Sequence, residues 1–264
     1  MGQLYKQEVS QCGKKDAVIA LGFYLYVCAV LYVFARLFHM PDLPIGSTVQ
    51  HFLSTALIVI PCLILAMRSK QGLASIGLHT KNLWPALRLG LVFAAIALLF
   101  RNILPGLVSG WAVQPFGDIL FMLFMAVTVS LLEDTMFTGY MQTRIYGLIK
   151  NDIAAVLLVA FLFAFSHVVA FAGLRGFSVA VSTFFSFAMI FWMAMHIIWN
   201  LMFRRYFSLF PIMLLHTFYN FGDTGIFARA ESAIPFLQFE ALLFAVAIWL
   251  LVVRWRERKA EQVE

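Results

Sequence analysis

Residues 131–144 read LLEDTMFTGYMQTR and place two adjacent carboxylates, Glu133 and Asp134, in an apolar run that begins near Pro115. A helix needs about 20 mainly apolar residues to cross a bilayer, and this run is long enough. Carboxylates at that depth are energetically costly and usually mark a functional site. The stretch therefore predicts a membrane-spanning helix that carries such a site.

The composition of the whole chain supports a membrane protein. Of its 264 residues, 62% are hydrophobic and 12% are charged, whereas soluble domains average about 25% charged residues. The formal net charge is +6, but the positive residues fall in short loops and at the termini, which is typical of topology signals. We therefore expect no nucleic-acid partner. The three cysteines show neither metal-site nor disulfide spacing.

Long apolar runs recur along the chain and predict an all-α bundle of about eight transmembrane helices. We interpret the first run as a retained span, because it is too long for the core of a cleaved leader. The polar segment 68–81 is expected to lie along the membrane surface. The chain is expected to form one integral membrane domain, 1–264, with spans near 16–38, 48–67, 83–104, 115–150, 152–171, 177–203, 208–221 and 233–253.

Loop charges predict the orientation of this bundle. Lys and Arg concentrate in the head, in 68–81, in the turns at 144–150 and 204–205 and in the tail, whereas the intervening loops hold few. Positive loops favour the cytoplasmic side. We therefore expect both termini in the cytoplasm and the chain in the cell membrane as a multi-pass protein.

Five polar side chains in the second half of the chain lie where lipid would disfavour them. The spans on either side of Lys150 form an antiparallel hairpin, and Glu133 and His167 are equally distant from residue 150, so they share one depth. His216 lies ten residues beyond the turn at Tyr206, roughly 15 Å from that end, a depth similar to that of Glu133. The five are His167, His196, Asn200, His216 and Asn220.

A carboxylate and imidazoles in a poorly hydrated pocket are suited to activating water. His167 can orient the water, or Glu133, His167 and His216 can together bind a divalent metal such as Zn²⁺. His216 and Asn220, four residues apart on one helix face, can stabilise an oxyanion. Structural alternatives stay open: His196 with Asn200 repeats the same spacing, and a membrane His often only bonds a neighbouring helix. Glu133 could likewise be a structural partner of one His.

Three motifs resemble those of the CPBP family of intramembrane proteases, the CAAX-protease and bacteriocin-processing proteins also called the Abi family. The segments EDTMFTG at 133–139, FAFSH at 163–167 and HTFYN at 216–220 follow the family's order Glu-Glu-x-x-x-Arg, Phe-x-x-x-His, His-x-x-x-Asn. The resemblance covers about 115–222, the expected protease-like core. It implies a membrane endopeptidase acting on a peptide or membrane-protein substrate, described in the family both as a metalloprotease and as a metal-free glutamate enzyme.

The resemblance also assigns roles to residues. Glu133 and His167 would activate water, Asp134 would support Glu133, and His216 and Asn220 would stabilise the oxyanion. Two departures stand out: Asp134 replaces the second Glu, and Thr138 replaces the Arg, which removes a cation. An alternative hypothesis is therefore a catalytically weakened regulator or bacteriocin-immunity-type protein that binds a partner. A proton-coupled transporter is a third interpretation, but the chain lacks two similar halves with interrupted helices.

Overall fold

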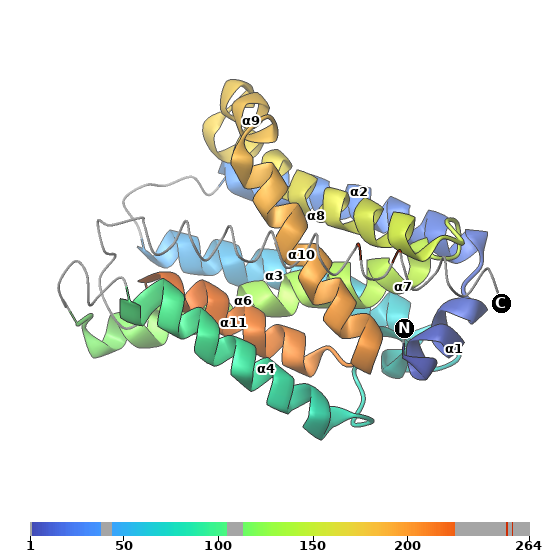
Figure 1. Ribbon diagram of the computed structural model, residues 1–264. Helices are drawn as coiled ribbons and strands as arrows, with labels where there is room; N and C mark the ends of the chain where they lie inside the picture. The colour runs from blue at the N-terminus through green and yellow to red at the C-terminus, as the bar shows by residue number, and fades with distance from the viewer. Residues whose placement is uncertain (1, 38–43, 105–112, 225–251, 253–254, 256–264) are drawn as a thin grey trace.

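The computed structural model describes residues 2–37, 44–104 and 113–224, together with 252 and 255. All elements in these ranges are helical, and no strand occurs among them (Figure 1). The predicted all-α fold class is therefore confirmed for the described part of the chain.

Within the described residues, five helices are long and apolar enough to cross a membrane, and the chain is an integral membrane protein. They are α2 (Lys14–Leu37), α4 (Leu83–Leu98) continued by η2 (Leu99–Ile103), α6 (Phe116–Glu133) continued to Ile145, α8 (Asp152–Arg175) and α10 (Phe187–Tyr206).

Two further helices occupy the second and seventh expected segments: α3 (Pro44–Met67) and α11 (Phe210–Thr224). The expected eighth span, 233–253, lies outside the described residues. The total of eight spans and the cytoplasmic location of the termini therefore stay predictions.

The expected single span over 177–203 is instead two helices, α9 (Phe177–Phe184) and α10. The break falls at Phe185 and Ser186, where the Ser186 hydroxyl accepts a hydrogen bond from the Ala188 N–H at 3.2 Å. A serine in this position caps a new helix. Hydropathy missed the break because apolar residues continue on both sides of it.

Small residues bring pairs of membrane helices close together. At Gly173 of α8 an added Cβ would lie 2.5 Å from the Tyr32 carbonyl oxygen of α2, and at Gly90 of α4 it would lie 2.9 Å from the Pro211 Cα of α11. Close backbone approach of this kind is how small residues favour helix packing in membranes. Figure 1 shows α2 beside α8 and α4 beside α11.

The polar head forms a short helix, α1 (Gln3–Gln11), that packs on the end of the bundle. Tyr5 is fully buried, and its hydroxyl donates to the Gln142 carbonyl oxygen at 3.2 Å. The Gly2 N–H donates to the Arg204 carbonyl oxygen at 2.8 Å. The helix α1 thus ties the ends of two membrane helices together.

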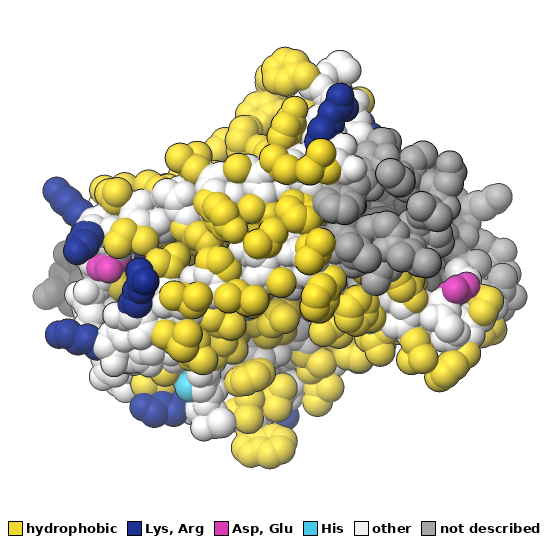
Figure 2. Space-filling view, turned by 180° about the vertical axis from the view of Figure 1, so that it is seen from behind, with side chains coloured by type: hydrophobic (Ala, Val, Ile, Leu, Met, Phe, Trp, Pro, Cys, Tyr) yellow, Lys and Arg dark blue, Asp and Glu magenta, His cyan; other side chains and the backbone are white. Residues whose placement is uncertain are grey.

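Part of the polar segment 68–81 is also inside the bundle. It contains the 3-10 helix η1 (Gly72–Ile76), in which Ser75 and Ile76 are fully buried. The Leu209 N–H donates to the Gly77 carbonyl oxygen at 3.1 Å. Lys and Arg side chains gather at the end of the molecule that holds α1, on the left of Figure 2, while hydrophobic side chains cover the middle.

Candidate active site

The first motif lies where helix α6 changes its winding. The α-helix ends at Glu133, and a π-helix, η3, follows over Asp134–Met141 before α7 (Gln142–Ile145). Every side chain of η3 is buried. The π-helices of proteins are rare and occur frequently at functional sites. The sequence predicted a continuous α-helix here and gave no sign of this change.

Glu133 lies between two imidazole rings that come from different helices. Its Oε1 is 3.8 Å from His167 Nε2 of α8, and its Oε2 is 3.6 Å from His216 Nε2 of α11. The depth comparison made on the sequence therefore placed these three residues correctly. Both distances exceed a direct hydrogen bond but suit one bridging water.

The second carboxylate, Asp134, holds His216. Its Oδ2 is 3.3 Å from His216 Nδ1, and both side chains are almost completely buried. Asp134 and Glu133 flank opposite nitrogens of the His216 ring, and a ring that carries a proton on Nδ1 donates a hydrogen bond to Asp134. The sequence predicted a supporting role for Asp134, and the partner that the structure gives it is His216.

His167 is held differently, by its own helix. Its Nδ1 lies 3.1 Å from the Phe163 carbonyl oxygen. A carbonyl can only accept, so we assign the proton to Nδ1. In the neutral ring, Nε2 then presents a lone pair toward Glu133.

Two tryptophans of α10, neither of which was predicted from the sequence as a site residue, form aromatic walls for these histidines. The Trp192 ring stacks on His167 with centroids 4.4 Å apart, and the Trp199 ring lies 4.0 Å from His216. Residues 192, 196 and 199 have the spacing of one helix face. This spacing, which places both tryptophans on the helix face of His196, was the signal available in the sequence.

His196 and Asn200 lie behind this layer and do not reach the carboxylates. Both are fully buried, and His196 stacks on Phe163 with centroids 4.4 Å apart. Among the described residues, no side-chain nitrogen or oxygen of the two has a hydrogen-bond partner. His196 thus packs as an aromatic ring on Phe163 and does not make, among the described residues, the interhelical hydrogen bond that the structural interpretation predicted.

Asn220 occupies the next turn of α11 after His216 and is half-buried. Its neighbour Tyr219 stacks against a cation, the Arg101 guanidinium of η2, at 3.8 Å from the ring centroid. Arg101 and Asn102 are both buried, and hydropathy gave no sign that Arg101 contacts α11.

Glu133 also lines a cavity of about 190 Å³ between α2, α3, α6 and α8. Most of its wall is apolar, with hydroxyls from Ser54, Thr55 and Ser166. The Glu133 side chain is 18% exposed, whereas Asp134 is 1% exposed. Of the two carboxylates, Glu133 is thus the one that a substrate or water can reach.

The residues Glu133, His167 and His216 are chemically suited to Zn²⁺. As the side chains lie, however, no three His, Cys, Asp or Glu residues of the described ranges are grouped closely enough to hold a metal ion. The residues as placed in the described ranges therefore do not fit a metal.

In a comparison with protein-family models, residues 115–222 match the type II CAAX prenyl endopeptidase Rce1-like family. Residues 115–222 form an Rce1-like domain. This agrees with the CPBP resemblance and covers the three motifs. No curated protein and no solved structure matches the chain.

The Rce1-like domain begins at α6 and ends in α11. It therefore contains all four residues of the Glu133, Asp134, His167 and His216 cluster. The helices α2 and α3 lie before it, yet they line the Glu133 cavity. The candidate site is thus built partly by segments outside the matched domain.

Proposed function

We propose that this protein is an intramembrane endopeptidase that hydrolyses a peptide bond with water activated by Glu133. The observation that carries the proposal is the position of Glu133, with its two carboxylate oxygens 3.8 and 3.6 Å from the Nε2 atoms of His167 and His216. The Rce1-like domain supports the same reaction class.

In the proposed first step, a water molecule binds between Glu133 and His167. It donates one hydrogen to the carboxylate and the other to His167 Nε2, which fixes its lone pair toward the substrate. Glu133 removes a proton as the water oxygen adds to the scissile carbonyl carbon. Protonated Glu133 then passes that proton to the leaving nitrogen as the C–N bond breaks.

The developing oxyanion needs donors on the opposite side of the carbonyl. His216 can donate from Nε2 because Asp134 holds its Nδ1–H and compensates its charge. The Asn220 amide, one turn further along α11, is the proposed second donor. Loss of one such donor typically lowers the rate about 10²–10³-fold.

The proposed substrate is a peptide segment of a membrane-associated protein that enters the cavity beside Glu133. The family's name describes endopeptidases that act on CAAX prenyl proteins. We propose a prenylated C-terminal peptide as the first substrate to test, with an unprenylated membrane peptide of the same sequence beside it. We propose that the enzyme is located in the cell membrane.

The test is a cleavage assay on purified protein of measured metal content, with and without a chelator. Cleavage that continues in metal-free protein supports the glutamate mechanism. Cleavage that stops with the chelator and returns with added Zn²⁺ would contradict it and support a metalloprotease. The absence of product from every peptide offered would count against the protease proposal itself.

A second candidate function is a non-catalytic membrane regulator, and one observation favours it. Thr138 is fully buried where the family has Arg, and Arg144 does not replace that cation because it binds Glu8 and Ser75. The test is the biological role of a His167→Ala, His216→Ala double variant that inserts stably. Retained function favours partner binding, and lost function favours catalysis.

A further inference from the structure

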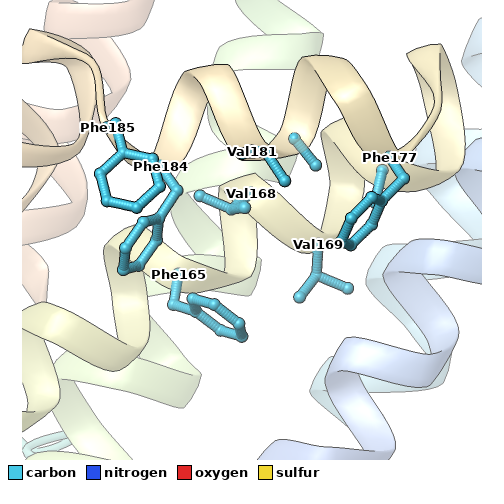
Figure 3. Close-up of a pocket in the computed structure, with 9 residues that line it drawn as sticks. Phe165, Val168, Val169, Phe177, Val181, Phe184 and Phe185 are labelled. Atoms are coloured by element: carbon cyan, nitrogen blue, oxygen red, sulfur yellow. The ribbon is translucent and has the colours of Figure 1, made fainter.

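An apolar groove lies between α8 and the short helix α9, at the end of the bundle away from α1. Its volume is about 320 Å³. Val169 and Phe177 line one end and Phe184 and Phe185 the other, and the side chains point toward one another across the groove (Figure 3). A closed apolar cavity of about 150 Å³ holds one benzene molecule, so this groove has room for a stretch of hydrocarbon chain.

The depth of the groove follows from the length of α8. This helix has 24 residues, or about 36 Å at 1.5 Å per residue, which exceeds the roughly 30 Å hydrocarbon core of a bilayer. Its first residue, Asp152, and its last, Arg175, therefore lie near opposite headgroup layers. The groove residues of α8, from Phe165 to Ala172, lie in the hydrocarbon next to the Arg175 layer.

A cation, Arg175, follows the last groove residue of α8, Ala172, by three residues in the chain. Arg175 is exposed, and its guanidinium carbon lies 5.5 Å from the centroid of the Phe171 ring. In the chain it comes between Ala172 and Phe177, both of which line the groove. Positive residues are sparse in the loops at this end, so a topology role does not account for Arg175.

We propose that this groove binds one phospholipid, with an acyl chain along the Phe and Val side chains and the phosphate at Arg175. A wholly apolar slot in the hydrocarbon and a guanidinium at headgroup depth match the two parts of such a lipid. Anionic lipids bind better than zwitterionic ones, because they add a net negative charge beside the guanidinium.

The groove is also connected to the candidate active site through packed side chains, and this connection matters only if the function proposed above is correct. Phe165, Phe184 and Trp192 pack against one cluster, and the Trp192 ring stacks on His167. The groove and the aromatic wall of His167 therefore share one packing cluster.

The test is native mass spectrometry of delipidated full-length protein titrated with palmitoyl-oleoyl phosphatidylglycerol. Wild type is expected to retain one lipid, and Val181→Trp and Arg175→Gln are each expected to lower the retained fraction at least fivefold. Val169→Phe fills the groove from α8 and replaces Val181→Trp if that variant folds poorly. Arg175→Lys should keep most of the binding.

Matched controls separate this groove from the rest of the lipid-facing surface. Val127→Trp alters a side chain of similar exposure, 46% against 40% for Val181, and Arg88→Gln removes an exposed cation on α4. Both should retain lipid as wild type does.

Three results would overturn the proposal: no retained lipid in wild type, equal retention in all variants, or a lowered melting temperature in Val181→Trp with unchanged lipid. The last result would show that another segment of the chain fills the groove. None of these measurements uses a peptide substrate, so their failure is distinct from failure of the protease proposal.

Discussion

At the level of single residues, the two site histidines differ in what fixes their rings. His216 is bound at Nδ1 by the Asp134 carboxylate, whereas His167 is bound at Nδ1 by a backbone carbonyl. A carboxylate stabilises a positively charged imidazole ring more strongly than a backbone carbonyl does. This asymmetry supports the proposed roles of His216 in oxyanion stabilisation and of His167 in water orientation.

Asp134→Asn is expected to lower the cleavage rate about 10–100-fold, the usual cost of losing a residue that orients a functional side chain. The reason is that the amide no longer compensates a charged His216 ring. The measurement is kcat alongside the melting temperature, which should change little. An unchanged kcat in folded protein would show that Asp134 does not act through His216.

His196→Phe is expected to leave activity intact and to stabilise the protein by up to about 1–3 kcal/mol, because it removes buried polar atoms that lack partners while keeping an aromatic ring on Phe163. Thermal unfolding in detergent measures this. His216→Phe is the matched variant and should abolish cleavage. A large loss of stability in His196→Phe would reveal a hydrogen-bonding role for His196.

Residue identity and helix spacing were enough to predict that Glu133, His167 and His216 lie at one depth, because depth along a straight membrane helix depends only on residue count. The same arithmetic could not give the partners of Arg144. Its guanidinium bonds the Ser75 hydroxyl at 2.7 Å and pairs with Glu8 at 3.4 Å. Those contacts depend on how two polar segments fold onto the bundle end, and no periodicity encodes that.

At the level of elements, α1 is the least expected part of the fold. Most of its residues are polar, yet the side chains of Tyr5 and Glu8 are buried against α7. Burial raises the pKa of Glu8, and the neighbouring Arg144 opposes the rise. A buried pair of this kind favours a specific docked position more than it adds stability.

The stability of the wild type relative to Glu8→Gln is expected to fall as the pH rises. With the folded pKa of Glu8 above its unfolded value near 4.5, the native state binds more protons than the unfolded state between the two values. The contribution of Glu8 is therefore lost as the pH rises through the folded pKa. Melting temperatures of both proteins from pH 4 to 7 measure this difference, and a difference that grows with pH would contradict the pKa shift.

The π-helix η3 and the break between α9 and α10 share a reason for being missed. Hydropathy reports whether a residue faces an apolar environment, and it does not report how the backbone is wound or capped. At Ser186 a single side-chain hydrogen bond starts a new helix. In η3 every residue after Glu133 is buried. The change from α-helix to π-helix is therefore associated with packing against neighbouring helices, which the local sequence does not report.

At the level of the whole molecule, the chain combines an Rce1-like domain with helices that precede it. The α2 and α3 helices lie before residue 115 but line the cavity beside Glu133. The sequence predicted the membrane class and the bundle from hydropathy alone. It could not predict which helices share a cavity, because that depends on side-by-side packing.

The predicted orientation can be measured with single cysteines in a variant that lacks Cys12, Cys28 and Cys62. Lys6→Cys and Gly117→Cys are both exposed and lie at the starts of α1 and α6. A membrane-impermeant maleimide applied to intact cells should label position 117 and leave position 6 unlabelled until the cells are opened. Labelling of position 6 in intact cells would reverse the topology.

In the proposed mechanism, the Glu133 carboxylate removes a proton from the attacking water. The most direct measurement is the cleavage rate of Glu133→Gln beside Asp118→Asn, which neutralises an exposed carboxylate at the start of the same helix. Glu133→Gln keeps the side-chain shape, so peptide binding should persist. We expect at least a 10²-fold loss of kcat in Glu133→Gln and no loss in Asp118→Asn. Cleavage by folded Glu133→Gln at the wild-type rate would contradict it.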